Sequence, residues 1–320
     1  MCFEQNGANQ CLTAQQAKIA RQAQQQAEQQ KLLDGMRKGI GVHKPPAGPQ
    51  AVQSWNGRRM RQAQPLPLLQ IDREKLRLIP AVPRGASKFA GDRTDEGGQK
   101  GSGPSYTTPL KWAGRLFFRT PEGDKTCSAQ FIDSRIILTA AHCVRDPATG
   151  SFYENIVFAL QYYNNDASRR YAGRCVATPD KWVGPTPQNY PWDYALILTD
   201  QSLTGHFGWE INWDGAATPV AKIGYPGEIA SGEVVQVDHG PATMSIDGSI
   251  VQLRHGNPRS THGGSGGAWV DRYSNGADRE ANRILSVSSF IMTSEPEVAY
   301  GPYLDEEFNR LLQYVKGGCP

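Results

Sequence analysis

Three short segments carry side chains that could together perform nucleophilic catalysis. TAAHCV places His142 after an apolar run, PWDYALIL places Asp193 before another, and THGGSGGAWV places Ser265 in a glycine-dense turn. A serine hydroxyl is a weak nucleophile at neutral pH, so a histidine must take its proton and a buried carboxylate must orient that imidazole. Each segment alone is more often structural, but together they predict a Ser-His-Asp set that attacks a carbonyl carbon.

The glycines around Ser265 suit the charge that such an attack creates. The developing oxyanion needs donors that already point at it, and glycine allows the backbone to turn so that two amides converge. We expect the N–H groups of Gly263 and Ser265 to be these donors. Losing one such donor typically costs about a hundred- to thousand-fold in rate.

The elements that must position these residues read as strands. After Pro109 the sequence consists of short β-branched and aromatic runs separated by turn residues, without the helices that alternating βαβ units need. This pattern predicts an all-β sandwich or barrel. A terminal helix is expected over LDEEFNRLLQYVKGG, whose apolar residues share one face. The runs are GRLFFR, SAQFID, RIILTA, NIVFALQYY, YALILT, VAKIGY, EVVQVD, SIVQLR, GAWVDR and RILSVSSFIM.

Residues 1–105 differ from residues 106–320 in charge and composition. They hold 16 Lys and Arg against 8 Asp and Glu, while the remainder holds 18 against 23. We expect one Gln/Ala-rich helix from Thr13 to about Lys38, followed by an irregular stretch rich in Pro and Gly. Residues 1–105 are therefore predicted to form a basic pro-segment or linker, and residues 106–320 a catalytic domain. A solvated tail is the favoured interpretation of this basic segment, and a nucleic-acid-binding segment is the alternative.

The three segments resemble the chymotrypsin-like serine peptidases. LTAAHCV is similar to the histidine signature of that family, DYALIL to its aspartate segment and GGSGGAWV to its serine segment, in the same chain order. The resemblance runs from about Leu110 to Val315. It implies two six-stranded antiparallel β-barrels with the triad between them, a C-terminal helix packed on the second, and a disulfide between Cys127 and Cys143 that braces the histidine loop.

The sequence also departs from the trypsin pattern. Gly264 stands where trypsins carry an aspartate that pairs with a newly freed N-terminus, and no IVGG-like start follows a basic residue, so trypsin-style activation is not expected. The bacterial glutamyl endopeptidase branch also lacks that aspartate, and GYPGE is similar to a loop of that branch. By this resemblance Arg259 lies at the floor of the specificity pocket, where it either favours an acidic substrate residue or points to solvent. His262 either contacts substrate or is a surface histidine.

These observations predict a secreted or periplasmic serine endopeptidase acting on polypeptides. The alternative is a catalytically silent binding protein on a peptidase fold. No cofactor, metal or membrane span is expected, because no ligand-spacing motif and no stretch of about 18 apolar residues occurs. No secretory signal is visible at the start of the chain, and the oligomeric state stays open.

Six cysteines suit an exported protein, and Cys2, Cys11, Cys175 and Cys319 permit three pairings. Arg58, Arg59 and Arg61 are expected to form an exposed processing site. The intact chain should therefore be less active than one that starts near Ser105.

Overall fold

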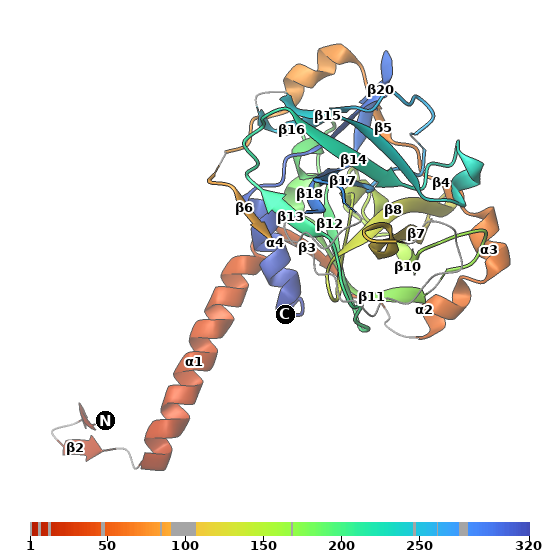
Figure 1. Cartoon of the computed structure of the whole chain (residues 1–320). Helices are drawn as coiled ribbons and strands as arrows, with labels where there is room; N and C mark the ends of the chain where they lie inside the picture. Colours follow the sequence, from red (N-terminus) through yellow and green to blue (C-terminus); the bar gives the residue numbers. More distant parts are fainter. Residues whose placement is uncertain are drawn as a thin grey trace.

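Two β-sheets form the body of the protein in a computed structural model (Figure 1). Both sheets contribute buried apolar side chains to the core. No helix in the described part of the chain is both long and apolar enough to cross a membrane. The structure describes residues 2–5, 8–11, 14–45, 49–83, 85–90, 107–167, 169–245, 248–260, 262–274 and 281–320.

The first sheet contains a closed six-stranded barrel. Its strands are hydrogen-bonded in the order β10-β7-β8-β9-β12-β11, and pairing of β10 with β11 closes the ring. Side chains alternate between two faces, so Leu116 and Phe118 join one apolar cluster and Phe117 joins another. Both faces are covered, which explains why the strands read as nearly continuous apolar runs. The barrel strands are β7 (Ala113–Thr120), β8 (Gly123–Asp133), β9 (Ile136–Thr139), β10 (Glu154–Leu160), β11 (Arg169–Pro179) and β12 (Ala195–Thr199).

The second sheet is built mainly from the C-terminal half of the chain. Its hydrogen-bonded order is β5-β19-β20-β16-β15-β14-β17-β18-β13-β6, and the Ser286 hydroxyl on β18 donates to the Pro302 carbonyl on β20. With the closed first barrel and the C-terminal helix, this arrangement confirms the predicted all-β chymotrypsin-like fold. The strands contributed by this half are β13 (Gly208–Ile211), β14 (Thr218–Gly224), β15 (Gln236–Ser245), β16 (Ile250–Arg254), β17 (Ala268–Asp271), β18 (Arg283–Val287), β19 (Phe290–Met292) and β20 (Glu295–Pro302).

The predicted C-terminal helix is α4 (Glu306–Lys316). The Asp305 carboxylate caps it by accepting from the backbone N–H groups of Glu307 and Phe308. Its expected apolar face is buried, comprising Phe308, Leu311, Leu312 and Val315. A disulfide joins Cys319, just after the helix, to Cys175 on β11. Of the three pairings that the sequence permits, the structure therefore has the one that joins Cys175 to Cys319.

The N-terminal helix is also present, as α1 (Ala14–Arg37); Thr13 lies outside the described residues. Figure 1 shows it projecting from the body, with the hairpin of β1 (Cys2–Gln5) and β2 (Ala8–Cys11) at its far end. The expected boundary at residue 105, and Ser105 itself, lie outside the described residues, so this division stays a prediction.

Between α1 and that boundary, four short strands extend both sheets. In the first sheet β3 pairs with β11 and β4 with β8, and in the second β5 pairs with β19 and β6 with β13. The composition of this stretch predicts irregular structure, but backbone pairing attaches it to the body. The strands are β3 (Ile40–His43), β4 (Gln64–Pro65), β5 (Leu69–Ile71) and β6 (Lys88–Ala90).

Two short helices of this stretch, α2 (Pro49–Ser54) and α3 (Gly57–Gln62), flank Trp55, whose side chain enters the barrel core. Trp55 is fully buried, donates from Nε1 to the Asn155 carbonyl and packs on Phe117 at a ring separation of 5.3 Å. Arg59 lies 3.9 Å above the Trp55 ring and pairs with Asp124 at 2.6 Å. The prediction that Arg59 is exposed is wrong, because its guanidinium anchors α3 to the barrel.

We expect Trp55→Ala to destabilise the protein by about 3–5 kcal/mol, the usual cost of removing a large buried aromatic side chain. Gln53→Ala, on the exposed side of α2, is the control and should change stability by less than about 0.5 kcal/mol. Denaturant unfolding measures both variants. A loss below about 1 kcal/mol for Trp55→Ala would show that this stretch does not contribute to the core.

Candidate active site

The structure brings His142 and Asp193 together, as the sequence predicts. His142 lies in a single 3-10 turn after β9, and Asp193 ends a similar turn before β12. Nδ1 of His142 is 2.7 Å from Oδ2 of Asp193, and the His142 backbone N–H donates to Oδ1 at 2.8 Å. Because a carboxylate only accepts, the proton belongs on Nδ1, which leaves Nε2 able to act as a base.

Ser289 completes the surroundings of this carboxylate. Its hydroxyl donates to Oδ2 of Asp193 at 2.5 Å, and both side chains are fully buried. Ser289 directly precedes β19 of the second sheet, so the contact ties the two sheets together. Sequence analysis missed this residue, because nothing in SVSSFIM distinguishes one serine from the next.

The Ser265 turn is held by the first barrel. The Ser128 backbone N–H donates to the Ser265 carbonyl, and the Ser128 hydroxyl donates to the Gly263 carbonyl, both at 2.8 Å. Gly263 and Gly266 have positive φ values of 79° and 75°. A Cβ atom on Gly266 would lie 2.1 Å from the Thr139 hydroxyl oxygen, so glycine is required there on steric grounds as well.

The remaining link of the predicted triad is not formed in this structure. Nε2 of His142 and Oγ of Ser265 are both buried, and neither has a hydrogen-bond partner among the described residues. Ser265 is fully buried and His142 is 3% exposed. His142 and Ser265 therefore make no hydrogen bond with each other in this structure.

The two predicted substrate-binding residues lie on the surface beside the turn at residues 226–228. Nη2 of exposed Arg259 donates to the Glu228 carbonyl at 2.9 Å. His262 is also exposed, and its backbone N–H and ring Nδ1 contact the Glu228 carboxylate. Both residues are therefore surface residues in this structure, which was one of the two alternatives for each. A contact of either residue with substrate stays a prediction.

A buried lysine supports the loop that leads into the Ser265 turn. Nζ of Lys222 donates to the carbonyl and the hydroxyl of Ser260 at 2.7 and 2.6 Å and lies 3.5 Å from Oδ2 of Asp238. Asp238 also accepts from the Asn257 side chain. Burial lowers the pKa of Lys222 from 10.5 to about 8. Sequence analysis missed Lys222, because a lone lysine in VAKIGY reads as a solvated strand residue.

One candidate metal-ligand group occurs among the described residues, comprising His142, Cys127 and Cys143. Both cysteines form a disulfide with each other, so they offer no thiolate to a metal. We therefore infer no metal site from this group.

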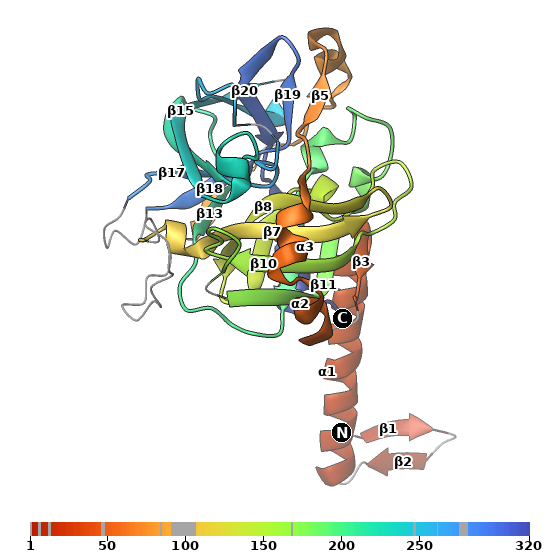
Figure 2. The ribbon, with the colours of Figure 1, turned by 90° about the vertical axis from the view of Figure 1, so that its right-hand side faces the viewer.

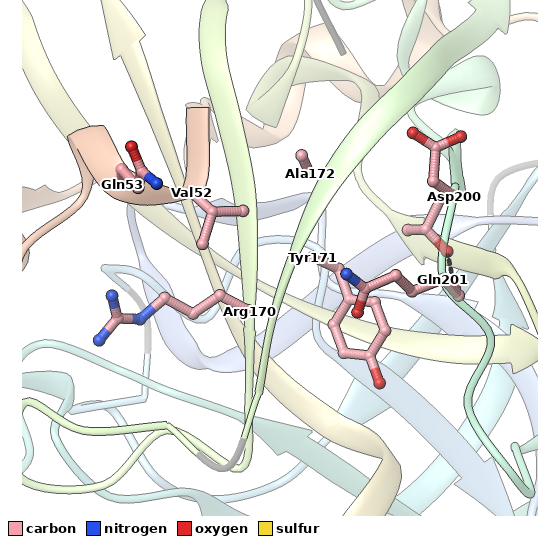
Figure 3. Close-up of a pocket in the computed structure, with 8 residues that line it drawn as sticks. Val52, Gln53, Arg170, Tyr171, Ala172, Asp200 and Gln201 are labelled. Atoms are coloured by element: carbon pink, nitrogen blue, oxygen red, sulfur yellow. Dashed lines mark hydrogen bonds between the residues drawn. The ribbon is translucent and has the colours of Figure 1, made fainter. Parts of the chain in front are cut away.

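A hollow of about 320 Å³ lies elsewhere, between α2 and the barrel (Figure 3). Arg170 and Asp200 approach it from β11 and from the end of β12, and no triad residue lines it.

Comparisons with known proteins identify the family and the fold. A family model described as Trypsin matches residues 99–274, which is more than half of the chain. The chain belongs to the trypsin family. Its members are serine endopeptidases, so the chain is a trypsin-like hydrolase acting on polypeptides.

Solved structures show the same fold. A thermostable serine protease AL20 from an extremophilic microorganism is 24% identical, with a TM-score of 0.55 over 65% of this chain and 98% of that one. The protease Anisep from Arthrobacter nicotinovorans is 22% identical, with a TM-score of 0.55 over 67% and 98%. A Glu endopeptidase is 18% identical, with a TM-score of 0.53 over 71% and 97%. No curated protein matches the chain by sequence.

The disulfides of this trypsin-family chain fit an extracellular protein. The bridge between Cys127 and Cys143 is present, as the resemblance implies. It joins β8 directly to the turn that holds His142 and so braces that turn.

Lys222 should give the stability of this trypsin-family chain a specific pH dependence. Its pKa is about 8 when folded and near 10.5 when unfolded. Between these values the unfolded state binds more protons, so the Lys222 contribution to the unfolding free energy rises with pH, by roughly 1 kcal/mol per unit. Below pH 8 both states are protonated and the contribution stops changing.

Denaturant unfolding of the parent and of Lys222→Met at pH 7.5 and pH 10 measures this contribution. The difference between the two proteins should shift in favour of the parent at the higher pH. Titration of other groups cancels in the comparison. An unchanged difference would mean that Lys222 keeps its ordinary pKa in the fold.

Proposed function

We propose that the protein is a secreted serine endopeptidase in which His142, Asp193 and Ser265 act as a catalytic triad. The observation that carries the proposal is the buried Asp193 carboxylate, which fixes His142 through two hydrogen bonds within a trypsin-family fold. A carboxylate in this position holds the imidazole in the tautomer that general-base catalysis needs.

Catalysis would proceed through an acyl-enzyme. Oγ of Ser265 attacks the peptide carbonyl carbon while Nε2 of His142 takes the hydroxyl proton, and the N–H groups of Gly263 and Ser265 stabilise the oxyanion. The tetrahedral intermediate collapses, the C–N bond breaks, and His142 gives its proton to the leaving amine. Water, deprotonated by His142, then attacks the ester, and the released Ser265 oxygen regains a proton.

The catalytically silent alternative is not favoured. A binding protein that had lost activity would have no need to keep a buried charge in its core, because an unpaired or weakly paired carboxylate there costs stability. Here all three triad residues are retained, and Asp193 accepts from three donors.

Ser265→Ala should lower hydrolysis of casein by at least about 10⁴-fold, because the attacking oxygen is removed. Covalent labelling by a fluorophosphonate should disappear in the same variant. Ser134→Ala, an exposed serine on the turn between β8 and β9, is the matched control and should retain both activities. A measurable hydrolysis by the parent that persists unchanged in Ser265→Ala would overturn the triad assignment.

Substrate preference is best read from a cleavage profile of the parent on a mixed peptide library. If acidic residues precede the cleaved bonds, Arg259→Ala should reduce cleavage after them without changing other cleavages. Equal profiles for parent and variant would place Arg259 outside substrate recognition.

A further inference from the structure

Residues 64–71, which we call the covering segment, run from the first sheet to the second across the proposed active site. Figure 2 shows this part of the chain leaving α3 beside β7 and β8 and rising to β5 beside β19. Its two ends are strands β4 and β5, each paired in parallel with a strand of the body. The segment is therefore held in an extended conformation at both ends.

The first end of the covering segment packs against the oxyanion turn. The Leu66 backbone N–H donates to the Thr126 carbonyl on β8 at 2.9 Å. Pro65 lies so close to two glycines that a Cβ atom on Gly227 would be 2.3 Å from Cγ of Pro65, and one on Gly263 would be 3.1 Å from Cβ of Pro65. The Pro65 ring therefore packs directly against the turn that contains Gly263.

The next contact occupies a donor that catalysis needs. The Gly263 backbone N–H donates to the Leu66 carbonyl at 2.7 Å. This N–H is one of the two proposed oxyanion donors, and a substrate carbonyl has to reach it during the reaction. While Leu66 is in place, that donor is not available to a substrate.

The second end lies beside the residue that contacts Asp193. The Leu69 backbone N–H donates to the Ser289 carbonyl at 3.2 Å, and the Thr293 N–H donates to the Ile71 carbonyl at 3.2 Å. The side chains of Leu68 and Ile71 are only 3% and 4% exposed. Apolar burial thus adds to the backbone pairing here.

We propose that the covering segment is an intramolecular inhibitor that binds the substrate face of the enzyme as an extended strand and must leave before a polypeptide can bind. This inference rests on the proposed function. The segment contacts Gly263, two residues before the fully buried Ser265, and it also contacts Ser289, which binds Asp193, so it touches both parts of the proposed site. A peptide that binds as an extended strand gains affinity from main-chain hydrogen bonds to the exposed edge of a sheet.

The segment is an inhibitor rather than a substrate in this arrangement. Its Leu66 carbonyl is held at an oxyanion donor, but Oγ of Ser265 is not hydrogen-bonded to Nε2 of His142, so the nucleophile is not activated. Pro65 and Pro67 restrict the backbone and lower the entropy lost on binding.

Ion pairs fasten the chain on both sides of the covering segment. Upstream, Arg59 makes two hydrogen bonds to the Asp124 carboxylate, and downstream Arg73 pairs with Glu295. Tethering makes binding intramolecular, with an effective concentration that free substrate does not easily match. A cut after Arg58 or Arg61 would leave the segment joined to the body through residues 72–106, so such processing alone would not release it.

The test compares two equivalent substitutions in the full-length chain. Leu68→Asp places a charge at a buried position of the covering segment, whereas Leu78→Asp places the same charge at a position that is 44% exposed. The rate of fluorophosphonate labelling is measured for the parent and both variants, with circular dichroism to check folding. We expect Leu68→Asp to label at least about tenfold faster than the parent, because the open population rises, and Leu78→Asp to label at the parental rate.

Other results would overturn the inference. If the parent labels as fast as Leu68→Asp, with labelling lost in Ser265→Ala, the proposed function stands and the inhibitor role fails. If no folded form labels, the proposed function fails and the inference fails with it. If Leu68→Asp does not fold, Leu69→Pro is used in its place, because proline removes the N–H that Leu69 donates to Ser289. Gln70→Ala is then the control. The same acceleration of labelling is expected for Leu69→Pro.

Discussion

The buried carboxylate of Asp193 is the interaction on which the rest of the structure depends. A charge removed from water is tolerated only when it is paired and hydrogen-bonded, and Asp193 meets this requirement with two donors from His142 and one from Ser289. His142 and Asp193 come from the first barrel, whereas Ser289 comes from the second sheet. The two halves must therefore be packed together before the site exists, which couples catalytic geometry to complete folding.

The covering segment occupies a backbone group that the proposed mechanism also needs, the N–H of Gly263. The carbonyls of Thr126 and Ser289 and the N–H of Gly263 are fixed by the strands and the turn that also hold the proposed triad. An enzyme with the proposed mechanism cannot remove the Gly263 N–H without losing oxyanion stabilisation, so this donor remains open to any extended chain that reaches it. A segment of the same chain, tethered on both sides, has the first opportunity.

The sequence was sufficient for the parts of this arrangement that depend on side-chain type. The strand runs, the C-terminal helix, and the segments around His142, Asp193 and Ser265 all carry patterns that chemistry and burial impose. The role of residues 64–71 could not be predicted, because backbone N–H and C=O groups make its main contacts and every residue but proline has both. Ser128, Lys222 and Ser289 were missed for a related reason, since a buried hydroxyl or ammonium is recognised only by its partners in space.

Gly264 connects these observations to the control of activity. It has no carboxylate to pair with a freed N-terminus, and the loop ahead of the Ser265 turn is held instead by the internal cation of Lys222. Lys222 is present as soon as the chain folds, so the turn needs no cut to assume its conformation. Because the turn forms without a cut, activity is best restrained by limiting access to the proposed site. Under the inhibitor role proposed above, the Leu66 carbonyl limits access, because it accepts from the Gly263 N–H, one of the two proposed oxyanion donors.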